Sequence, residues 1–372
     1  MVAGEASGDL LAAQLIKSMK SVWPGMALQG IGGPHMVQAG FDARWPSEKL
    51  SVRGYVEVLR HYKEIVGIRK SLKQRLMANP PDLFIGVDAP DFNLDLEHDL
   101  KSSGVKTLHF ICPSVWAWRP ERIEKIRQSV DHVLCIFPFE VELLAQHAVA
   151  ATYVGHPLAN MIPMQPDKSA ARAALGLAAD DFVLAVLPGS RLSEIDYLAH
   201  RFFQAAALVK HARSGVKIVV PAIPTLFDTI VQVAHKAGVA QDVQILRGQS
   251  HQVLAACDIT LIASGTATLE AALFKRPMVI AYNMNWISWQ IMQRKKLQPW
   301  VGLPNILCRE FVVPEFLQDQ ATPQALAAAV LQWAESPAKI AALQTRFTAL
   351  HSELHRDTAK LATHAIQEIL KA

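Results

Sequence analysis

Short apolar runs alternate with longer segments of helical periodicity along most of the chain, and this alternation constrains the fold most. Runs that are apolar throughout are typical of parallel strands covered on both faces, and the helices between them form βαβ units. The expected strands are residues 28–33, 83–88, 106–111, 132–137 and 152–155, followed by 182–189, 217–222, 243–248, 258–264 and 277–282. The first residues also have the character of a strand, which would be unusually short. The pattern predicts an α/β protein with doubly wound, Rossmann-like sheets.

A break near residues 160–170, rich in proline and polar residues, divides the expected strands into two sets. We therefore expect an N-terminal domain at 1–160 and a C-terminal domain at 161–335. An alanine-rich helical tail follows, in which Thr322 caps a helix and Pro323 occupies its first position. C-terminal helices at 336–372 form the third expected part.

Composition excludes several classes of protein. A chain of 372 residues, of which 51% are hydrophobic and 19% charged, can bury two large cores and is not largely disordered. The formal net charge of +4 is too small to imply nucleic-acid binding. No apolar run approaches the ~18 residues that span a bilayer, and no signal peptide is expected. The cysteines form no C-x-x-C pair and are expected to be reduced core thiols rather than metal ligands: Cys112, Cys135, Cys257 and Cys308.

Ligands of doubly wound sheets bind beyond the carboxyl ends of the strands, so the residues there are the candidates for a site. In the second half Gly189, Ser190 and Arg191 follow a strand and open a helix that contains Glu194. Glycine lets the backbone approach an anion, free N–H groups and the helix dipole attract phosphate, and arginine can bind it with two hydrogen bonds. The alternative is a capped helix with a surface arginine.

A second loop of this kind follows the strand at 258–264. Ser264, Gly265 and Thr266 supply hydroxyl and N–H donors, and Glu270 can accept hydrogen bonds from two adjacent ribose hydroxyls. The alternative here is a capping box. Further on, Asn305 lies in a turn, where it is either a plain turn residue or a third contact. Two such loops in one half of the chain favour binding of a nucleotide diphosphate.

The first half offers carboxylates and aromatic side chains at its strand ends. Asp88 ends a buried strand, where partial desolvation suits a general base, and Asp91 follows Pro90; the alternative is that either caps the next helix. Trp116 and Arg119 follow another strand and can line a sugar or acyl site, although paired tryptophans are also common in cores.

The opening loop, VAGEASGD at 2–9, carries Glu5, Ser7 and Asp9 where many nucleotide-binding folds hold phosphate. These carboxylates would repel phosphate and suit the hydroxyls of a neutral polyol, so the first half is expected to bind a sugar-like acceptor. A dinucleotide fingerprint is lacking, because His35 replaces the third glycine of GIGGPH. No D-x-D pair is present, so we expect no metal and no cofactor, with Arg191 and helix dipoles neutralising the leaving group.

Residues 56–77 form a basic amphipathic stretch that is expected to be helical. Such a stretch either lies on an anionic membrane or faces a core with a solvated basic side. The HSELH sequence at 351–355 lacks the order of a zinc-protease motif, so metal binding is not expected there.

Taken together, the strand-end motifs closely resemble those of the lipid-A-disaccharide synthases, bacterial glycosyltransferases of lipopolysaccharide assembly. The matching motifs are VAGEASGD (2–9), VDAPDFN (87–93), PSVWAWR (113–119), FPFE (137–140), GHP (155–157), LPGSR (187–191) with Glu194, ASGTATLE (263–270) and LPN (303–305). The chain departs from the family pattern at His35, where arginine is commoner, and at Asn160, where an acid is common.

The resemblance implies a GT-B fold and transfer of 2,3-diacylglucosamine from its UDP derivative onto 2,3-diacylglucosamine 1-phosphate (lipid X), with UDP released and a β-1,6 linkage formed with inversion. It implies that Asp88 is the base, that Glu5 and Ser7 line the acceptor side, and that Arg191, Glu270 and Asn305 line the UDP side. It also implies a peripheral protein on the cytoplasmic face of the inner membrane, and C-terminal helices that pack on an N-terminal domain, their own or that of a partner in a swapped homodimer.

Two other readings remain open at this point. One is another GT-B enzyme acting on UDP-GlcNAc, either an epimerase or a transferase for polyprenyl-linked sugars. The other is a non-catalytic nucleotide-sugar-binding protein. Turnover of acylated against unacylated sugars separates these readings.

Overall fold

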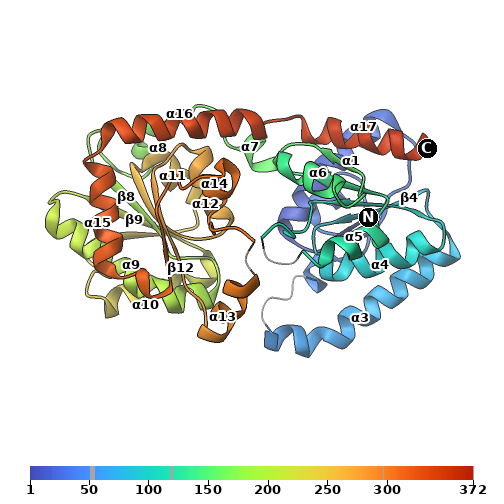
Figure 1. The fold of residues 1–372 in the computed structure, drawn as a ribbon, viewed down its shortest axis with the longest axis horizontal. Helices are drawn as coiled ribbons and strands as arrows, with labels where there is room; N and C mark the ends of the chain where they lie inside the picture. Colours follow the sequence, from blue (N-terminus) through green and yellow to red (C-terminus); the bar gives the residue numbers. More distant parts are fainter. Residues whose placement is uncertain (51–54, 118–119, 296, 372) are drawn as a thin grey trace. The chain divides into compact units, whose positions relative to one another are not determined.

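The computed structural model describes residues 1–50, 55–117, 120–295 and 297–371, and these residues form two compact units. The first unit comprises residues 1–160 together with 354–372, and the second comprises 161–353. Figure 1 shows a parallel sheet flanked by helices in each of them.

The described strands of the first unit form a seven-stranded parallel sheet in the order β3-β2-β1-β4-β5-β6-β7. They are β1 (Val2–Ala3), β2 (Gln29–Gly32), β3 (Asp42–Pro46), β4 (Leu83–Val87), β5 (Lys106–Phe110), β6 (His132–Cys135) and β7 (Ala151–Tyr153). The helices are α1 (Ala6–Val22), α2 (Pro34–Gln38), α3 (Tyr55–Ala78), α4 (Pro90–Ser102), α5 (Arg122–Ser129), α6 (Pro138–Ala145), α7 (Pro157–Met161) and α17 (Thr358–Lys371), with a 3₁₀ turn at Ser47–Lys49.

The described strands of the second unit form a six-stranded parallel sheet in the order β10-β9-β8-β11-β12-β13. They are β8 (Val183–Leu187), β9 (Lys217–Ala222), β10 (Val243–Arg247), β11 (Ile259–Ala263), β12 (Met278–Tyr282) and β13 (Glu315–Leu317). The helices are α8 (Lys168–Ala174), α9 (Leu192–Ala212), α10 (Phe227–Lys236), α11 (Ser250–Ala256), α12 (Thr266–Leu273), α13 (Trp286–Lys295), α14 (Leu303–Cys308), α15 (Pro323–Ala334) and α16 (Pro337–Leu354), with 3₁₀ turns at Pro224–Leu226 and Gln318–Gln320.

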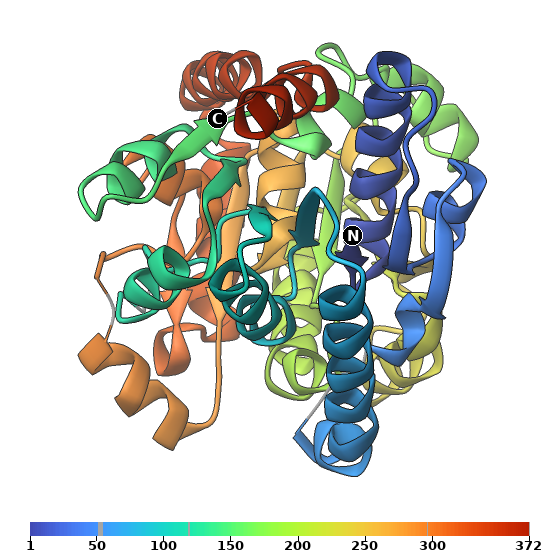
Figure 2. The ribbon, with the colours of Figure 1, turned by 90° about the vertical axis from the view of Figure 1, so that its right-hand side faces the viewer.

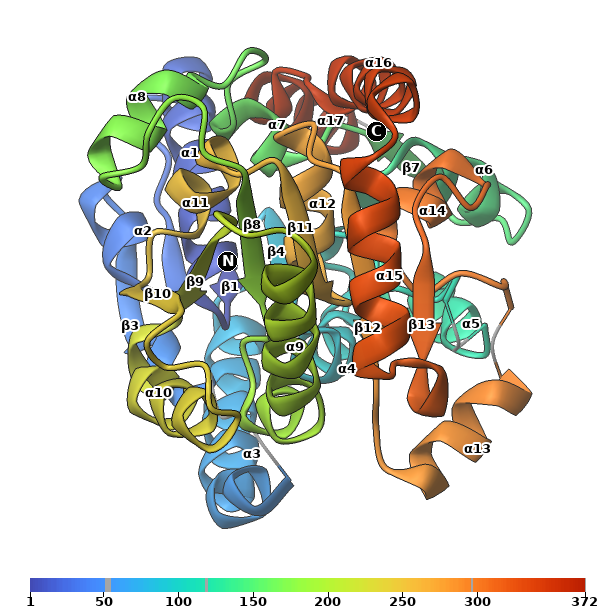
Figure 3. The same ribbon diagram turned by 90° about the vertical axis from the view of Figure 1, so that its left-hand side faces the viewer.

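Each sheet is doubly wound, which confirms the predicted fold class. The strand order reverses between β1 and β4 in the first unit and between β8 and β11 in the second. Figure 3 shows α9 and α15 covering one face of the second sheet, where Phe202 and Phe203 are fully buried. Ligands of such sheets bind at the point of reversal. The loops after β1, β4, β8 and β11 are therefore the expected ligand-binding loops.

The C-terminal helix α17 packs against α1 of its own unit. Thr363 Oγ1 donates to Ser18 Oγ at 2.8 Å, and Lys106 Nζ donates to the carbonyl of Ile369 at 2.7 Å. In Figures 1 and 2, α17 and α3 lie at opposite ends of this unit. Asn160, one of the two departures from the family pattern, donates to the carbonyl of Arg356 at 2.6 Å and so holds the segment that enters α17.

Candidate active site

The loops that follow β1 and β4 lie side by side at the reversal point of the first sheet. β1 pairs with β4 so that Ala3 stands opposite Val87, which places Gly4 next to the start of the Asp88 loop. A Cβ added to Gly4 would lie 3.3 Å from the Cβ of Ala89, so the two loops are in contact. The structure thus brings together the loops that carry Glu5 and Asp88.

Asp88 occupies a strained turn rather than the cap of a helix. It has φ +54° and Ala89 has φ +46°, a left-handed conformation that non-glycine residues seldom adopt. Asn93 Nδ2 donates to the Asp88 carbonyl at 2.7 Å, and the Asp88 N–H donates to the Phe110 carbonyl at 2.9 Å. The N-cap of α4 is Ala89, which forms no side-chain cap, so the alternative role of Asp88 as a helix cap is not observed. The Asp88 carboxylate is half-buried.

Asp9 is turned into the unit, contrary to the expectation that both carboxylates of the opening loop meet a ligand. Its Oδ1 accepts hydrogen bonds from the N–H groups of Gly33 (2.9 Å) and Met36 (3.0 Å), and its Oδ2 accepts one from His35 (3.0 Å). The side chain is 2% exposed and satisfies the N-terminus of α2. A Cβ on Gly33 would lie 2.6 Å from this carboxylate, which explains the glycine. In the opening loop, the half-buried Glu5 and the exposed Ser7 therefore stay as candidates.

The other acceptor-side candidates differ in how they are placed. Asp91 lies in the first turn of α4, where Arg122 Nη2 contacts its Oδ1 at 2.5 Å on the surface. Trp116 is half-buried, and its indole N–H donates to Glu140 Oε1 at 3.0 Å. Arg119 lies outside the described residues.

Trp116 belongs to an aromatic cluster that joins three family motifs. Its ring packs edge-on against Phe137 and Phe139, with centroids 6.2 and 5.4 Å away, and Phe137 contacts His156 at 5.3 Å. Burial lowers the pKa of His156 to about 4, so its ring is neutral at neutral pH. The packing interpretation of Trp116 is therefore confirmed for this part of its ring surface.

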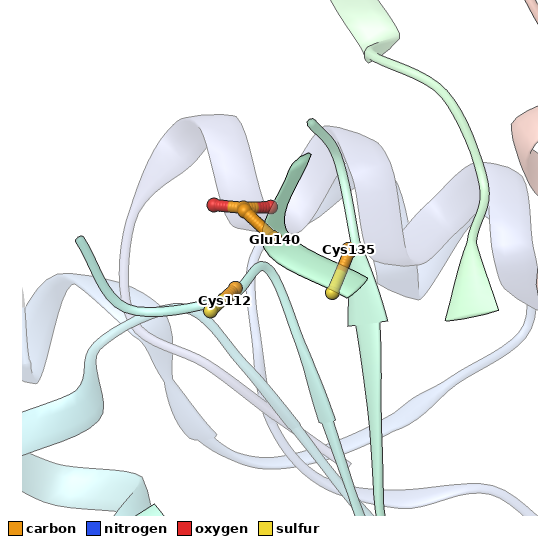
Figure 4. Close-up of side chains that lie close together, drawn as sticks. All are labelled: Cys112, Cys135 and Glu140. Carbon is orange, nitrogen blue, oxygen red and sulfur yellow. The ribbon is translucent and has the colours of Figure 1, made fainter. Parts of the chain in front are cut away.

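Glu140 and two thiols form a buried cluster beside this aromatic group (Figure 4). One ligand atom each from Cys112, Cys135 and Glu140 lie within 4.8 Å of one another. Both Glu140 oxygens already accept hydrogen bonds, Oε1 from Trp116 and Oε2 from the Phe137 N–H at 3.0 Å. Burial raises the pKa of Glu140 to about 8, and contact with Cys135 together with burial raises that of Cys112. Since both carboxylate oxygens are engaged within the protein and all three side chains are buried, we assign the cluster to the core.

The HSELH segment also contains a structural histidine. His351 is fully buried in α16, and its Nδ1 lies 2.6 Å from Nζ of Lys275. It therefore faces the interior of the second unit.

In the loop after β8, the Glu194 carboxylate accepts the backbone N–H groups that the sequence analysis expected to be free for a ligand, so that expectation is wrong. Glu194 Oε2 accepts the N–H of Ser190 at 2.8 Å and that of Arg191 at 3.3 Å. Gly189 has φ +126°, and a Cβ there would lie 2.6 Å from Glu194 Oε2, so both conformation and space require glycine. The side chain of Arg191 is 75% exposed and contacts Glu194 only at 3.5 Å. In this loop the guanidinium, rather than the backbone, is available to bind phosphate.

The loop after β11 is open. Ile262 pairs with Leu187, so this loop and the β8 loop leave the sheet side by side. Gly265 is exposed, and no atom lies within 4 Å of a Cβ built on it. α12 begins at Thr266 with Gly265 as a cap that lacks a side-chain bond, so the alternative capping box is not formed. Ser264 Oγ donates to the Val301 carbonyl at 2.9 Å, which ties the loop to the segment before α14.

The Glu270 carboxylate contacts the ring of His251, a residue that the sequence analysis did not identify as a candidate. His251 Nε2 lies 3.4 Å from Glu270 Oε2, and this contact raises the pKa of His251. The Glu270 side chain is 19% exposed, which leaves room for a further hydrogen-bonding partner.

Asn305 is fully buried, and its side-chain amide is saturated. Nδ2 donates to the Val313 carbonyl at 2.9 Å and to Glu315 Oε1 at 2.8 Å, while Oδ1 accepts the N–H groups of Val312 and Val313. Glu315 also accepts the N–H groups of Val301 and Gly302, each at 2.9 Å. Asn305 thus lies in α14 rather than in the expected turn, and its amide holds the segment that follows this helix instead of being presented to a ligand.

The basic helix α3 packs on the core of the first unit. Ile68, Leu72 and Leu76 are buried, and Lys73 Nζ contacts Asp99 Oδ2 on α4 at 2.6 Å. The core-facing alternative is thus observed for the described side chains of α3, while Lys63, Lys70 and Arg75 are exposed. Among the described residues, no helix is long and apolar enough to cross a bilayer.

The fold and the two strand-end sites define the class of the protein. A UDP-GlcNAc 2-epimerase from Neisseria meningitidis, solved with UDP-GlcNAc, has a TM-score of 0.61 at 10% identity and matches 97% of this chain and 96% of its own. WaaG, a glycosyltransferase involved in lipopolysaccharide biosynthesis, has a TM-score of 0.54 at 13% identity and matches 96% of this chain and 95% of its own. The chain has the GT-B fold that such transferases and epimerases share.

The particular family follows from the sequence. The family model described as lipid-A-disaccharide synthetase matches residues 1–370. The lipid-A-disaccharide synthase of Albidiferax ferrireducens is 68% identical over 376 residues, which cover 100% of this chain and 97% of that protein. The chain belongs to the lipid-A-disaccharide synthase family, and it is a glycosyltransferase.

Proposed function

We propose that the chain condenses UDP-2,3-diacylglucosamine with lipid X to give the β-1,6 lipid A disaccharide 1-phosphate and UDP, with inversion. The observation that carries this proposal is the family match over residues 1–370. It is supported by the two pairs of loops at the reversal points of the sheets, one acidic and one with an exposed arginine.

The proposed reaction is a single displacement. The 6-hydroxyl oxygen of the acceptor forms a bond to the anomeric carbon of the donor as the bond from that carbon to the UDP oxygen breaks. Asp88 takes the hydroxyl proton, and UDP leaves with the electron pair. General base action is worth about 10²–10⁴-fold in rate. The strained turn at Asp88 supports this role, because such turns persist where the surrounding structure fixes them for function.

On the acceptor side, Glu5 and Ser7 are proposed to bind the sugar hydroxyls, and Asp91 and Arg119 to line the same site. Trp116 is proposed to act mainly by packing, since Glu140 holds its indole N–H.

On the donor side, the residues proposed to form the UDP site are Gly189, Ser190, Arg191, Ser264, Gly265, Thr266, Glu270 and Asn305. Their proposed roles differ: Arg191 meets the diphosphate, Glu270 meets the ribose, and Asn305 supports the site by holding the segment after α14. Since the sequence has no D-x-D pair, we propose that Arg191 and helix N-termini neutralise the leaving group without a bound metal.

We further propose that the protein is peripheral on the cytoplasmic face of the inner membrane, with the exposed lysines and arginine of α3 meeting anionic lipid. A homodimer in which the C-terminal helices exchange is proposed as a second arrangement of α17. The N-terminal part, residues 1–160, is proposed as the acceptor domain and 161–335 as the UDP-sugar domain.

Mass spectrometry of the product tests the function. Purified protein with UDP-2,3-diacylglucosamine and lipid X is expected to give the tetraacyl disaccharide 1-phosphate and one UDP per product. Release of UDP with unacylated UDP-GlcNAc alone would favour the epimerase or another transferase, and UDP binding without any product would favour a binding protein. Full activity in the presence of EDTA is expected.

A further inference from the structure

Two ionisable side chains are buried beside Asp88 and have no part in the reaction described above. Glu97 lies on α4 and His109 on β5, and the side chains of both are 0% exposed. His109 Nδ1 is 2.8 Å from Oε1 and 3.0 Å from Oε2 of Glu97. A buried pair of this kind is costly to desolvate, so its presence next to a candidate base calls for a role.

The register of the sheet makes His109 a neighbour of Asp88. His109 is paired with Gly86, and paired residues of parallel strands direct their side chains to the same face. Asp88 is the first residue after β4, two positions beyond Gly86, and its charge acts on the His109 ring. The next residue of β5, Phe110, accepts the N–H of Asp88 at 2.9 Å.

The Glu97 carboxylate is fixed in place by contacts with the backbone of β4. A Cβ on Gly86 would lie 2.2 Å from Glu97 Oε1, so the carboxylate is pressed against the backbone of β4. The backbone of Gly86 also forms a hydrogen bond to this carboxylate. With both oxygens facing Nδ1, the carboxylate fixes the ring orientation of His109 and places a proton on Nδ1.

The opposite ring nitrogen, Nε2, is therefore left to change its protonation state. It is buried, and it has no hydrogen-bond partner among the residues that the structure describes. The same is true of Asn93 Oδ1, whose amide nitrogen donates to the Asp88 carbonyl. Two unsatisfied polar atoms thus lie on the elements that surround Asp88.

Two charged groups act on His109, Glu97 from α4 and Asp88 from the end of β4. Burial opposes a positive charge on His109, but the charge and hydrogen bond of Glu97 and the charge of Asp88 outweigh it and raise the pKa of His109. Burial also raises the pKa of Glu97. We assign the proton between them to His109, because its Nδ1 faces both oxygens and Gly86 stabilises the carboxylate.

We propose that His109, oriented by Glu97, is a positioning residue of the transfer reaction: it fixes the surroundings of Asp88 and supplies a positive charge that favours the ionised carboxylate. The proposal rests on the proposed role of Asp88 as the base. His109 touches neither substrate, so it acts through Asp88 alone.

Steady-state kinetics of His109→Gln, Asp88→Asn and the double variant test this proposal. His109→Gln is expected to lower kcat about 10-fold, less than the loss of the base itself, with KM for both substrates within about twofold. Its kcat profile should lose activity at a higher pH on the acid side than that of the wild type. The double variant should be no slower than Asp88→Asn. His98→Gln, on the exposed face of α4, is the matched control and should be unchanged.

Wild-type kcat and pH profile for His109→Gln, or losses that multiply in the double variant, would overturn the proposal. Near-normal turnover of Asp88→Asn would instead refute the role of the base, so the two failures are distinguishable. If His109→Gln does not fold, the coupling between His109 and Asp88 can be tested by ¹⁵N-histidine NMR of the wild type and of Asp88→Asn. The histidine with a fixed Nδ1–H should titrate at a lower pH in Asp88→Asn, and an unchanged titration would contradict the coupling.

Discussion

Replacement of Asp9 tests whether its carboxylate is structural, as its hydrogen bonds indicate. In Asp9→Ala, the N–H groups of Gly33 and Met36 lose a buried acceptor, and the start of α2 loses a compensating charge. Each buried donor left without a partner costs about 1–3 kcal/mol, and the charge at a helix start adds about 0.3–1 kcal/mol. We expect a loss of about 3–5 kcal/mol. Asp9→Asn keeps one accepting oxygen and should lose about half as much.

Hydrogen exchange measured by mass spectrometry reports this loss where it occurs, and it does not require the two units to unfold in one transition. Peptides covering 29–41 should exchange about 10²–10³-fold faster in Asp9→Ala, because about 1.4 kcal/mol corresponds to tenfold. Asp42→Ala is the control: Asp42 pairs with Arg44 on the surface of the adjacent strand, and such pairs contribute about 0–1 kcal/mol. Exchange in Asp9→Ala no faster than in Asp42→Ala would refute the assignment.

Three further predictions concern other residues. Glu140 has a pKa raised to about 8 by burial, so the folded state keeps a proton that the unfolded state releases between pH ~4.5 and 8, and stability should fall as pH rises through this range. Glu140→Gln should lack this fall in thermal unfolding at pH 5, 7 and 9, and parallel curves would contradict it. Arg191→Ala should raise KM for the UDP-sugar about 10–100-fold without loss of stability, whereas Arg213→Ala at the other end of α9 should not; equal values for both would count against phosphate binding. Asn305→Ala should lower the urea midpoint of the second unit, with UDP affinity falling in step, and lost affinity at full stability would indicate direct contact instead.

Most strands were predictable from the sequence, including the edge strands β7 and β10, but the edge strands β3 and β13 were not. Runs such as residues 182–187 are apolar throughout, so their pattern indicates a central parallel strand. β3 and β13 were missed because their residues are half-exposed or exposed at the sheet edges and form no apolar run. The loops expected to bind ligands then followed from the strand order, since doubly wound sheets place these loops at the point of reversal.

The sequence predicted which loops at the strand ends carry the candidate residues, but it did not predict the hydrogen-bond partners of these residues. Glu5 and Asp9 belong to one motif, yet Asp9 turns inward because the N-terminus of α2, more than twenty residues away, supplies three donors. In the same way, Glu194 accepts the N–H groups of Ser190 and Arg191, which the motif alone leaves open. Asn305 is saturated by groups that follow it in the sequence. The hydrogen-bond partners of these three side chains depend on how the chain folds around them, and a sequence motif does not specify those contacts.

The histidine beside Asp88 shows the same limit. His109 stands in an apolar strand, and Glu97 lies on the preceding helix among exposed charges. Only the pairing of β4 with β5 and the packing of α4 bring these two side chains together next to Asp88. A histidine in an apolar run is a weak signal by itself, because buried histidines are common in cores.

The central claim is that Asp88 accepts the proton of the incoming hydroxyl. Its most direct test is single-turnover formation of the disaccharide by Asp88→Asn, with UDP binding measured on the same protein to verify the donor site. We predict a rate about 10²–10⁴-fold below that of the wild type with unchanged UDP affinity. A folded Asp88→Asn protein that forms the disaccharide at close to the wild-type rate would contradict the claim.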